Sequence, residues 1–256
     1  YVYSQKSFIL GTTGNDDNGH GSHVAGIAAA KDDSNGVVGV APGARLWAVK
    51  VLDKYGTGTL SNVIAGVDYV ASKSSEIEVA NLSLSTSNSL SLNSAIQKAV
   101  SKGITFVVAA GNSKTDAANI SPANSPDVIA VSAIVDTDGK CGGLGQATSY
   151  GSDDTFASFS NYGAVIDIAA PGVAIYSTYK TGAYATMSGT SMASPHVAGA
   201  AALIKSQNPA FTPLQVKSDL LDKGVKFDTV CDGGSNGYFA GDRDSIQEPL
   251  LNTQKY

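Results

Sequence analysis

Charged residues are scarce in this sequence, and basic residues nowhere form a cluster. Only 15% of the 256 residues are charged, against about 25% in an average globular protein. The net charge of −5, without a Lys/Arg patch, argues against nucleic acid as a partner. No apolar run reaches the roughly 18 residues that a membrane span needs, so we expect no membrane partner. The opening residues do not resemble a signal peptide.

Cysteine is also rare. Cys141 and Cys231 are the two cysteines of the chain, and their spacing matches no metal-binding motif. They are compatible with one disulfide in an oxidising compartment or with two buried thiols. Glycine is abundant, at 28 residues, and apolar residues make up 43%. The glycines predict many tight turns, and the apolar fraction is enough to fill the core of one domain of this length.

Apolar runs and helical patterns alternate along the chain. Helix-spaced apolar residues fall between 60 and 70 and between 92 and 100, with Gly103 expected at the C′ position of the second helix. Thr212-Pro213 and Gly224 bracket a further helix. This alternation predicts an α/β fold with a doubly wound, mostly parallel sheet and helices on both faces, and active sites beyond the strand ends. The predicted strands are residues 46–52, 79–84, 104–110, 128–134 and 165–169.

One stretch, residues 187–199, joins a turn of small residues to an apolar helix and leaves the hydroxyl of Ser191 at the junction. The free N–H groups and the dipole of the first helical turn favour an oxyanion that forms beside this hydroxyl. A serine at this place is equally suited to cap the helix. The segment alone leaves open whether Ser191 is a cap or a nucleophile.

Two other segments carry polar side chains at comparable junctions. His20 follows a polar turn that contains Asp16, Asp17 and Asn18, and it begins a helix of small residues. Asn112 ends the apolar run of the third predicted strand, where its carboxamide is a candidate oxyanion donor. An Asn after Gly is, by itself, more often a turn residue.

Together these segments resemble the subtilisin-like serine peptidases, in particular the proteinase K and archaeal subtilase branches. The matching motifs are HGSHVAG from His20, AAGN ending at Asn112, and GTSMASPH around Ser191. Their order and nearly the full length of the chain agree with that family. The resemblance implies a serine endopeptidase with Ser191 as nucleophile, His20 as general base, and Asn112 with the Ser191 N–H as oxyanion hole.

Substrate walls and partners also follow from the resemblance. Residues Gly56, Thr57 and Gly58 resemble the edge strand that pairs with a substrate backbone, and Ser83, Leu84 and Ser85 resemble the opposite wall. Most relatives carry two glycines where this chain has Ser85 and Thr86. We expect a protein or peptide substrate with an apolar or aromatic residue before the cut, a monomeric enzyme, and no cofactor for the chemistry.

The chain departs from the family at its N-terminus. The family's catalytic aspartate lies on a strand that ends in Asp-Thr-Gly or Asp-Ser-Gly, and none of the 19 residues before His20 fits that pattern. Asp16 and Asp17 match the acidic turn before the histidine helix, so we interpret them as caps. Residues 1–256 are therefore interpreted as an N-terminally incomplete peptidase domain, expected to be a very poor peptidase without that strand.

Two other functions compete with this one. An α/β-hydrolase esterase needs glycine two residues either side of its nucleophile, and position 193 here is Ala193. A non-catalytic peptide-binding pseudopeptidase would use the same cleft without acylating Ser191.

The resemblance further implies structural calcium and a disulfide. Asp167 and the carbonyls of Pro126 and Val128 align with a calcium site of proteinase K-like relatives, and Asp33 resembles part of a weaker site. Since the relatives are secreted and both cysteines lie in loop-like segments, we expect a Cys141–Cys231 disulfide and a secreted or cell-surface location.

Overall fold

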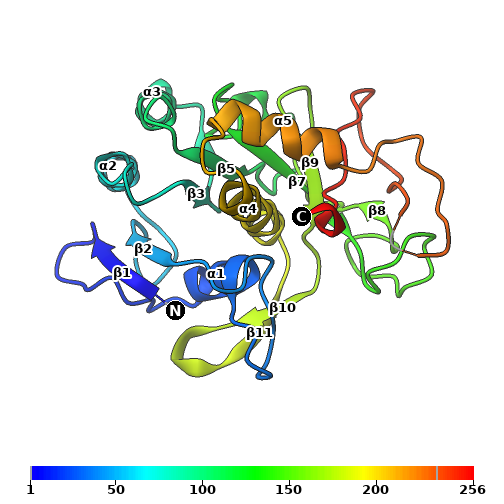
Figure 1. Ribbon diagram of the computed structural model, residues 1–256, viewed down its shortest axis with the longest axis horizontal. Coiled ribbons are helices and arrows are strands. Elements are labelled where there is room, and N and C mark those ends of the chain that lie inside the picture. The colour runs from blue at the N-terminus through cyan, green and yellow to red at the C-terminus, as the bar shows by residue number, and fades with distance from the viewer. Residues whose placement is uncertain (1, 235) are drawn as a thin grey trace.

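A parallel sheet of strands β3, β5, β7 and β9 forms the centre of the molecule (Figure 1). The computed structural model describes residues 2–234 and 236–256. The short β8 pairs antiparallel with the end of β7. The central strands agree with the predicted apolar runs to within a few residues; β9 starts three residues later than predicted. Their bounds are β3 (Val79–Leu82), β5 (Thr105–Ala109), β7 (Ile129–Val135), β8 (Thr155–Phe156) and β9 (Ile168–Pro171).

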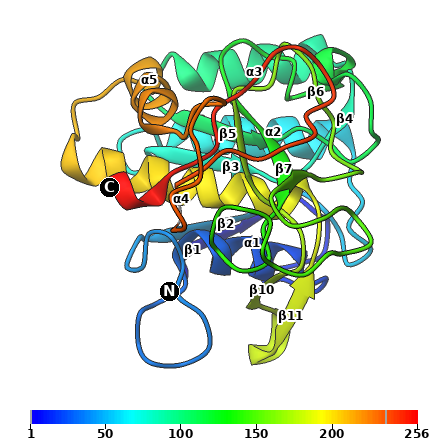
Figure 2. The same cartoon turned by 90° about the vertical axis from the view of Figure 1, so that its right-hand side faces the viewer.

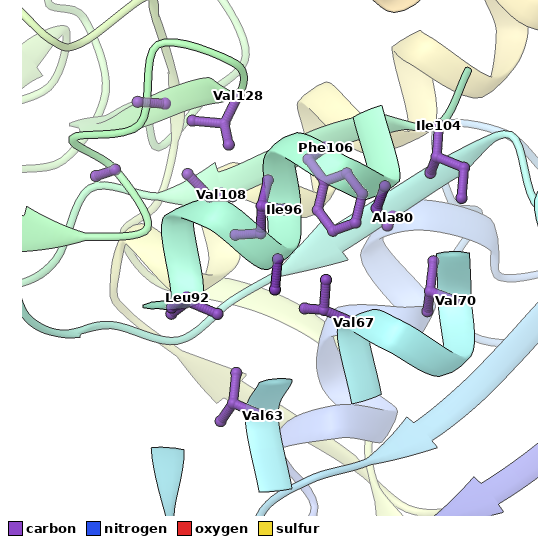
Figure 3. Packing of buried hydrophobic residues seen from close by; sticks show 14 of the residues in the cluster. Val63, Val67, Val70, Ala80, Leu92, Ile96, Ile104, Phe106, Val108 and Val128 are labelled. Atoms are coloured by element: carbon purple, nitrogen blue, oxygen red, sulfur yellow. The ribbon is translucent and has the colours of Figure 1, made fainter. Parts of the chain in front are cut away.

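Helices cover both faces of this sheet, as the sequence predicts. Phe106 and Val108 of β5 pack towards α2 and α3, in the core that Figure 3 shows, whereas Val107 packs on the other face with α4 and α5. Figure 2 separates α3 on one side of the central strands from α4 on the other. The alternation of side chains along β5 thus builds two cores. The helices are α1 (His20–Ala29), α2 (Leu60–Ser72), α3 (Leu90–Val100), α4 (Thr190–Gln207) and α5 (Pro213–Lys223).

The ends of α5 follow the local sequence signals, whereas α1 has Gly19 as its N-cap, without a side-chain cap, and α3 ends differently from the prediction. Thr212 caps α5 in a capping box with Gln215, and Gly224 is its C-cap. The expectation for Gly103 is wrong by one position: Ser101 is the C-cap of α3, so Gly103 falls at C″. Its φ of +95° and its N–H bond to the Val100 carbonyl nevertheless end the helix there.

Strands β1 (Val2–Ser7) and β2 (Leu46–Lys50) form a separate parallel pair. Sequence analysis did not predict β1, because its largely polar residues lie half or fully exposed and give no apolar run. Within the described residues, no backbone hydrogen bonds join β2 to β3, although Figure 1 shows them as neighbours in the row of strands. The sheet is therefore interrupted at this point.

The remaining elements are short, and a disulfide ties two loops together. Cys141 and Cys231 are bonded, with Cα atoms 5.5 Å apart, which confirms the predicted disulfide. In the part of the chain that the structure describes, no helix is long and apolar enough to cross a bilayer. The short elements are β4 (Thr86–Ser87) paired with β6 (Ile120–Ser121), β10 (Ile175–Thr178) paired with β11 (Tyr184–Met187), and the 3₁₀ turns η1 (Ala117–Asn119), η2 (Lys180–Gly182) and η3 (Thr253–Lys255).

Candidate active site

Ser191 is the second residue of α4, at the end of the helix where backbone N–H groups are free. Pro195, four residues later, has no N–H to donate to the Ser191 carbonyl. The hydroxyl of Ser83, just beyond β3, donates to that carbonyl instead at 2.8 Å. In return, the Ser191 hydroxyl donates to the Ser83 carbonyl at 3.3 Å. Because Pro195 leaves the Ser191 carbonyl free, Ser83 of the expected substrate wall can bind directly to the backbone of Ser191.

The Asn112 side chain is held by its oxygen. Asn112 Oδ1 accepts hydrogen bonds from both the N–H and the hydroxyl of Thr190, each at 2.9 Å. Since both bonds require the amide oxygen on this side, they fix the orientation of the carboxamide. The Nδ2 group then faces away from Thr190 and keeps its donors for another acceptor. This orientation leaves the Nδ2 group of Asn112 as the donor that the family resemblance implies.

Gly189 lies beside the two expected oxyanion donors. A β-carbon placed on Gly189 would lie 3.3 Å from Asn112 Nδ2 and 3.7 Å from the Ser191 nitrogen. The backbone of Gly189 has a φ of +156°. Both expected donors therefore lie near one point next to Gly189, so an oxyanion placed between them would be close to both.

Two residues that sequence analysis missed hold this loop in place. The hydroxyl of the buried Thr190 accepts the N–H of Gly111 at 3.1 Å. Asn161, fully buried, donates to the Ala110 carbonyl and accepts the N–H of Ser113. Thr190 lies within the GTSMASPH motif, but Asn161 is 49 residues from Asn112 and no local pattern marks it.

His20 begins α1, which packs against α4. The preceding Gly19 has a φ of +112° and lies under the ring of Tyr179, whose hydroxyl donates to the Asn18 carbonyl. Any side chain at position 19 would collide with that ring. Burial, followed by the nearby His23, lowers the pKa of His20, whereas Asp16 opposes the change. The imidazole is therefore neutral at neutral pH and able to accept a proton.

Of the two upstream aspartates expected to be caps, only Asp16 binds an N–H of the first turn of α1. Asp16 accepts the N–H groups of Asn18, Gly19 and Ser22. Burial raises the pKa of Asp16, but these hydrogen bonds outweigh it and lower the pKa overall. Asp17 pairs with Lys50 of β2. Among the described residues, no carboxylate makes a hydrogen bond to the His20 ring.

The other two histidines are bound to backbone carbonyls inside the protein. His23 is fully buried, with Nε2 at 3.0 Å from the carbonyls of Ile175 and Ala185 in the β10–β11 hairpin. Nδ1 of His196 contacts the Met192 carbonyl at 2.9 Å, and burial lowers its pKa to about 4. Both environments agree with the structural roles expected for these residues.

The two expected substrate walls differ in form. Residues 83–85 continue directly from β3. Gly56, Thr57 and Gly58 form no strand in the structure, so the expectation of an edge strand is not met there. The segment is an exposed turn whose N–H at Thr57 is bound by the Asp53 carboxylate at 3.1 Å. An edge strand of this kind needs a partner backbone to pair with.

The residues expected to bind calcium do not fit a calcium ion at their main site. Asp167 and Val128 do come together, but the ammonium of Lys217 lies between them, at 2.7 Å from Asp167 Oδ1 and 2.8 Å from the Val128 carbonyl. Pro126 lies in the turn that leads to β7. Asp33 lies in an exposed loop, where its carboxylate accepts the N–H of Asn35.

A cavity of about 480 Å³ lies away from the catalytic candidates, at the interruption of the sheet. It is bounded by Arg45 and Trp47 at the start of β2 and by Ile77 and Glu78, which lead into β3. The strands beside it are only partly buried: all five residues of β2 are half-buried, and only Ala80 of β3 is fully buried. The cavity therefore lies between the N-terminal ends of β2 and β3.

Comparison with known proteins gives one consistent result. The model of the subtilase family, peptidase S8, matches residues 7–239. Subtilisin DY of Bacillus licheniformis is 43% identical over 224 residues, which cover 86% of this chain and 75% of that protein. Subtilisin Savinase of Lederbergia lenta is 42% identical over 238 residues, covering 92% and 79%. The crystal structure of a cold adapted subtilisin-like serine proteinase superposes with a TM-score of 0.77 at 40% identity, covering 94% of this chain and 82% of the other.

Proposed function

The chain belongs to the subtilase family of serine endopeptidases, and we propose that Ser191 is its nucleophile and His20 its general base. The observation that carries this assignment is the pair of donors beside Gly189, Asn112 Nδ2 and the Ser191 N–H. Such a pair stabilises the negative charge that develops when a serine attacks a peptide carbonyl.

The proposed reaction starts with the Ser191 hydroxyl bound to the Ser83 carbonyl. This hydroxyl has to turn towards His20, which takes the proton as Ser191 attacks the peptide carbonyl carbon. His20 then delivers the proton to the leaving amine, and water releases the acyl group from Ser191. The lowered pKa of His20 keeps its imidazole in the accepting form before attack.

The substrate is a protein or peptide, bound in an extended form between residues 56–58 and 83–85. Neither segment contains a charged side chain, which supports the preference for an apolar or aromatic residue before the cut. The side chains of Ser85 and Thr86 narrow the first specificity pocket, compared with the two glycines that most relatives carry there. We further propose a monomeric, secreted or cell-surface enzyme without nucleic acid or membrane partners.

No cofactor enters this chemistry. A structural calcium ion is proposed only near Asp33, whose exposed carboxylate and neighbouring carbonyls offer oxygen ligands to a hard cation.

We place the aspartate that orients His20 on a further strand, upstream of Tyr1, seated between β2 and β3. Each of these strands has one hydrogen-bonded neighbour among the described elements, β1 for β2 and β5 for β3. Their free edges and the cavity at their N-terminal ends provide space for a strand, and the half-buried apolar residues of β2 would become covered.

The test compares this chain with one extended upstream by a strand that ends in Asp-Thr-Gly. We expect the extended chain to hydrolyse peptides about 10⁴-fold faster, the loss that removal of the triad aspartate causes in subtilisin. Labelling of Ser191 by a fluorophosphonate should accelerate likewise, and Ser191→Ala is the control. Equal and efficient turnover by both chains would assign the orienting role to a residue already present, such as Asp17. An extended chain that folds but is never labelled would favour a non-catalytic peptide-binding pseudopeptidase.

A further inference from the structure

The side chain of Lys217, on α5, extends to the N-terminal end of β7 in the central sheet. Its ammonium lies 2.7 Å from Asp167 Oδ1 and 2.8 Å from the carbonyl of Val128, which immediately precedes β7. The side chains of Lys217 and Asp167 are only 22% and 19% exposed. The ammonium therefore neutralises a largely buried carboxylate and satisfies a backbone carbonyl at once.

The second oxygen of Asp167 is occupied as well. Oδ2 accepts the N–H of Ala130 at 2.9 Å, and the Asp167 N–H donates to the Ala130 carbonyl at 3.0 Å. Oδ2 of Asp167 is thus bound to the backbone of β7, and Oδ1 is bound to Lys217. Burial raises the pKa of Asp167, whereas Lys217 and the Ala130 N–H oppose that rise because both favour the ionised carboxylate.

The helix that carries Lys217 is firmly positioned. Val216 and Leu220 of α5 are fully buried in the core shared with α4 and the sheet, and the capping box of Thr212 fixes its first turn. The lysine therefore extends from a fixed element, so only its own side-chain rotamers have to be ordered to make these contacts.

Calcium and an ammonium group compete for such a site. Calcium binds six to eight oxygens at about 2.3–2.6 Å, so the Asp167 oxygen and the Val128 carbonyl are ligands of the type and position expected for it. Two cations cannot share these two oxygens, because the ammonium already stands within about 3 Å of both and like charges repel strongly at that distance.

We propose that Lys217 is a built-in cation that replaces bound calcium at Asp167 and Val128. This segment of the protein is accordingly stabilised without a metal ion, whatever the calcium concentration. The site becomes a calcium site only when the ammonium is removed. This inference concerns stability, and it holds whether or not the proposed catalytic function is correct.

The test measures how calcium changes the melting temperature, by thermal unfolding in excess EGTA and in millimolar calcium. All chains carry Asp33→Asn, so that the other proposed calcium site does not contribute. For each chain, the calcium-induced change in melting temperature is measured with and without Asp167→Asn. The difference between the two is the Asp167-dependent shift. With Lys217 present we expect this Asp167-dependent shift to be below about 1 °C. With Lys217→Ala we expect a melting temperature lower by about 5 °C or more in EGTA, and a recovery of several degrees in calcium.

Lys217→Arg is the matched control, because it keeps the positive charge and should leave the chain insensitive to calcium. An Asp167-dependent calcium shift in the chain that retains Lys217 would overturn the proposal, and so would its absence in Lys217→Ala. The first comparison requires no change at Lys217, so it remains decisive even where Lys217→Ala does not fold.

Discussion

At the scale of single residues, the candidate site depends on how neighbouring atoms hold Asn112 and Ser191. Asn112 is bound through its oxygen, which leaves its nitrogen as the proposed donor. A donor fixed in this way before substrate binds avoids reorganisation during the reaction. The carbonyl of Ser191, which Pro195 leaves free, is bound by Ser83, but the Ser191 hydroxyl still has to turn from the Ser83 carbonyl towards His20.

Substituting Gly189→Ala should block the proposed oxyanion site. The new methyl group would stand 3.3 Å from Asn112 Nδ2, where the oxyanion has to bind. We expect the rate of Ser191 labelling by a fluorophosphonate to fall about 10²–10³-fold, similar to the loss of one oxyanion donor.

Gly43→Ala is the matched control for Gly189→Ala. Gly43 also has a positive φ, of +110°, but a β-carbon there meets no atom within 4 Å. It imposes backbone strain of the same kind without touching the site. Labelling rates that fall equally in both variants would show that strain, and not the oxyanion site, is responsible.

At the scale of elements, the C-terminal segment is attached to β7 through a buried carboxyl group. Glu248 is 6% exposed and accepts a hydrogen bond from Ser132 of β7, and Tyr238 donates to its backbone carbonyl. Burial, with the nearby Asp242, raises the pKa of Glu248 to about 7, although Ser132 opposes the rise. Burial of this carboxyl therefore costs least when it is protonated.

Glu248→Gln should reduce the loss of stability at alkaline pH. Because the folded pKa of Glu248 lies above its unfolded value, its protonated form contributes stability that is complete below about pH 4.5 and lost as pH rises through about 7. Between pH 5 and pH 8 the variant should lose less free energy of unfolding than the parent chain, by about 1–3 kcal/mol. Urea unfolding at the two pH values measures this difference. Glu76→Gln, at an exposed ion pair, is the control, and an unchanged pH dependence in Glu248→Gln would contradict the account.

At the scale of the whole molecule, segments far apart in the sequence are joined by few strong connections. The disulfide between Cys141 and Cys231 closes a loop with a sequence separation of 90. It joins the loop after β7 to the C-terminal segment. We therefore expect it to contribute to stability.

Replacing both cysteines by serine should lower the melting temperature by about 10 °C. A loop of this length corresponds to roughly 4–5 kcal/mol in the chain-entropy model, and about 1 kcal/mol shifts the melting temperature of a chain of this size by a few degrees. Calorimetry of the double variant, and of the parent chain after reduction, gives the measurement. Ser191 labelling at 20 °C should not change, and a melting temperature unaffected by both treatments would refute the prediction.

Local sequence patterns were enough to predict the fold class, and short motifs supplied the proposed site residues. Apolar periodicity and turn residues depend on neighbours within a few positions, so the central strands, the helices and the capping of α5 were predictable from local pattern. Ser191, His20 and Asn112 were recognised because each lies in a short motif at an element boundary. β1 was missed because its exposed polar residues carry no such pattern.

Contacts between residues that are far apart in the sequence could not be predicted from local patterns. The Ser83–Ser191 pair spans 108 positions and the Lys217–Val128 bond spans 89, and neither leaves a local trace. The same reason applies to the expected calcium site: Asp167 and Val128 do come together, but the ammonium beside both belongs to Lys217, 50 residues after Asp167. Whether an acidic group is bound by a metal or by a lysine depends on which side chains packing brings to it, and packing is a property of the whole chain.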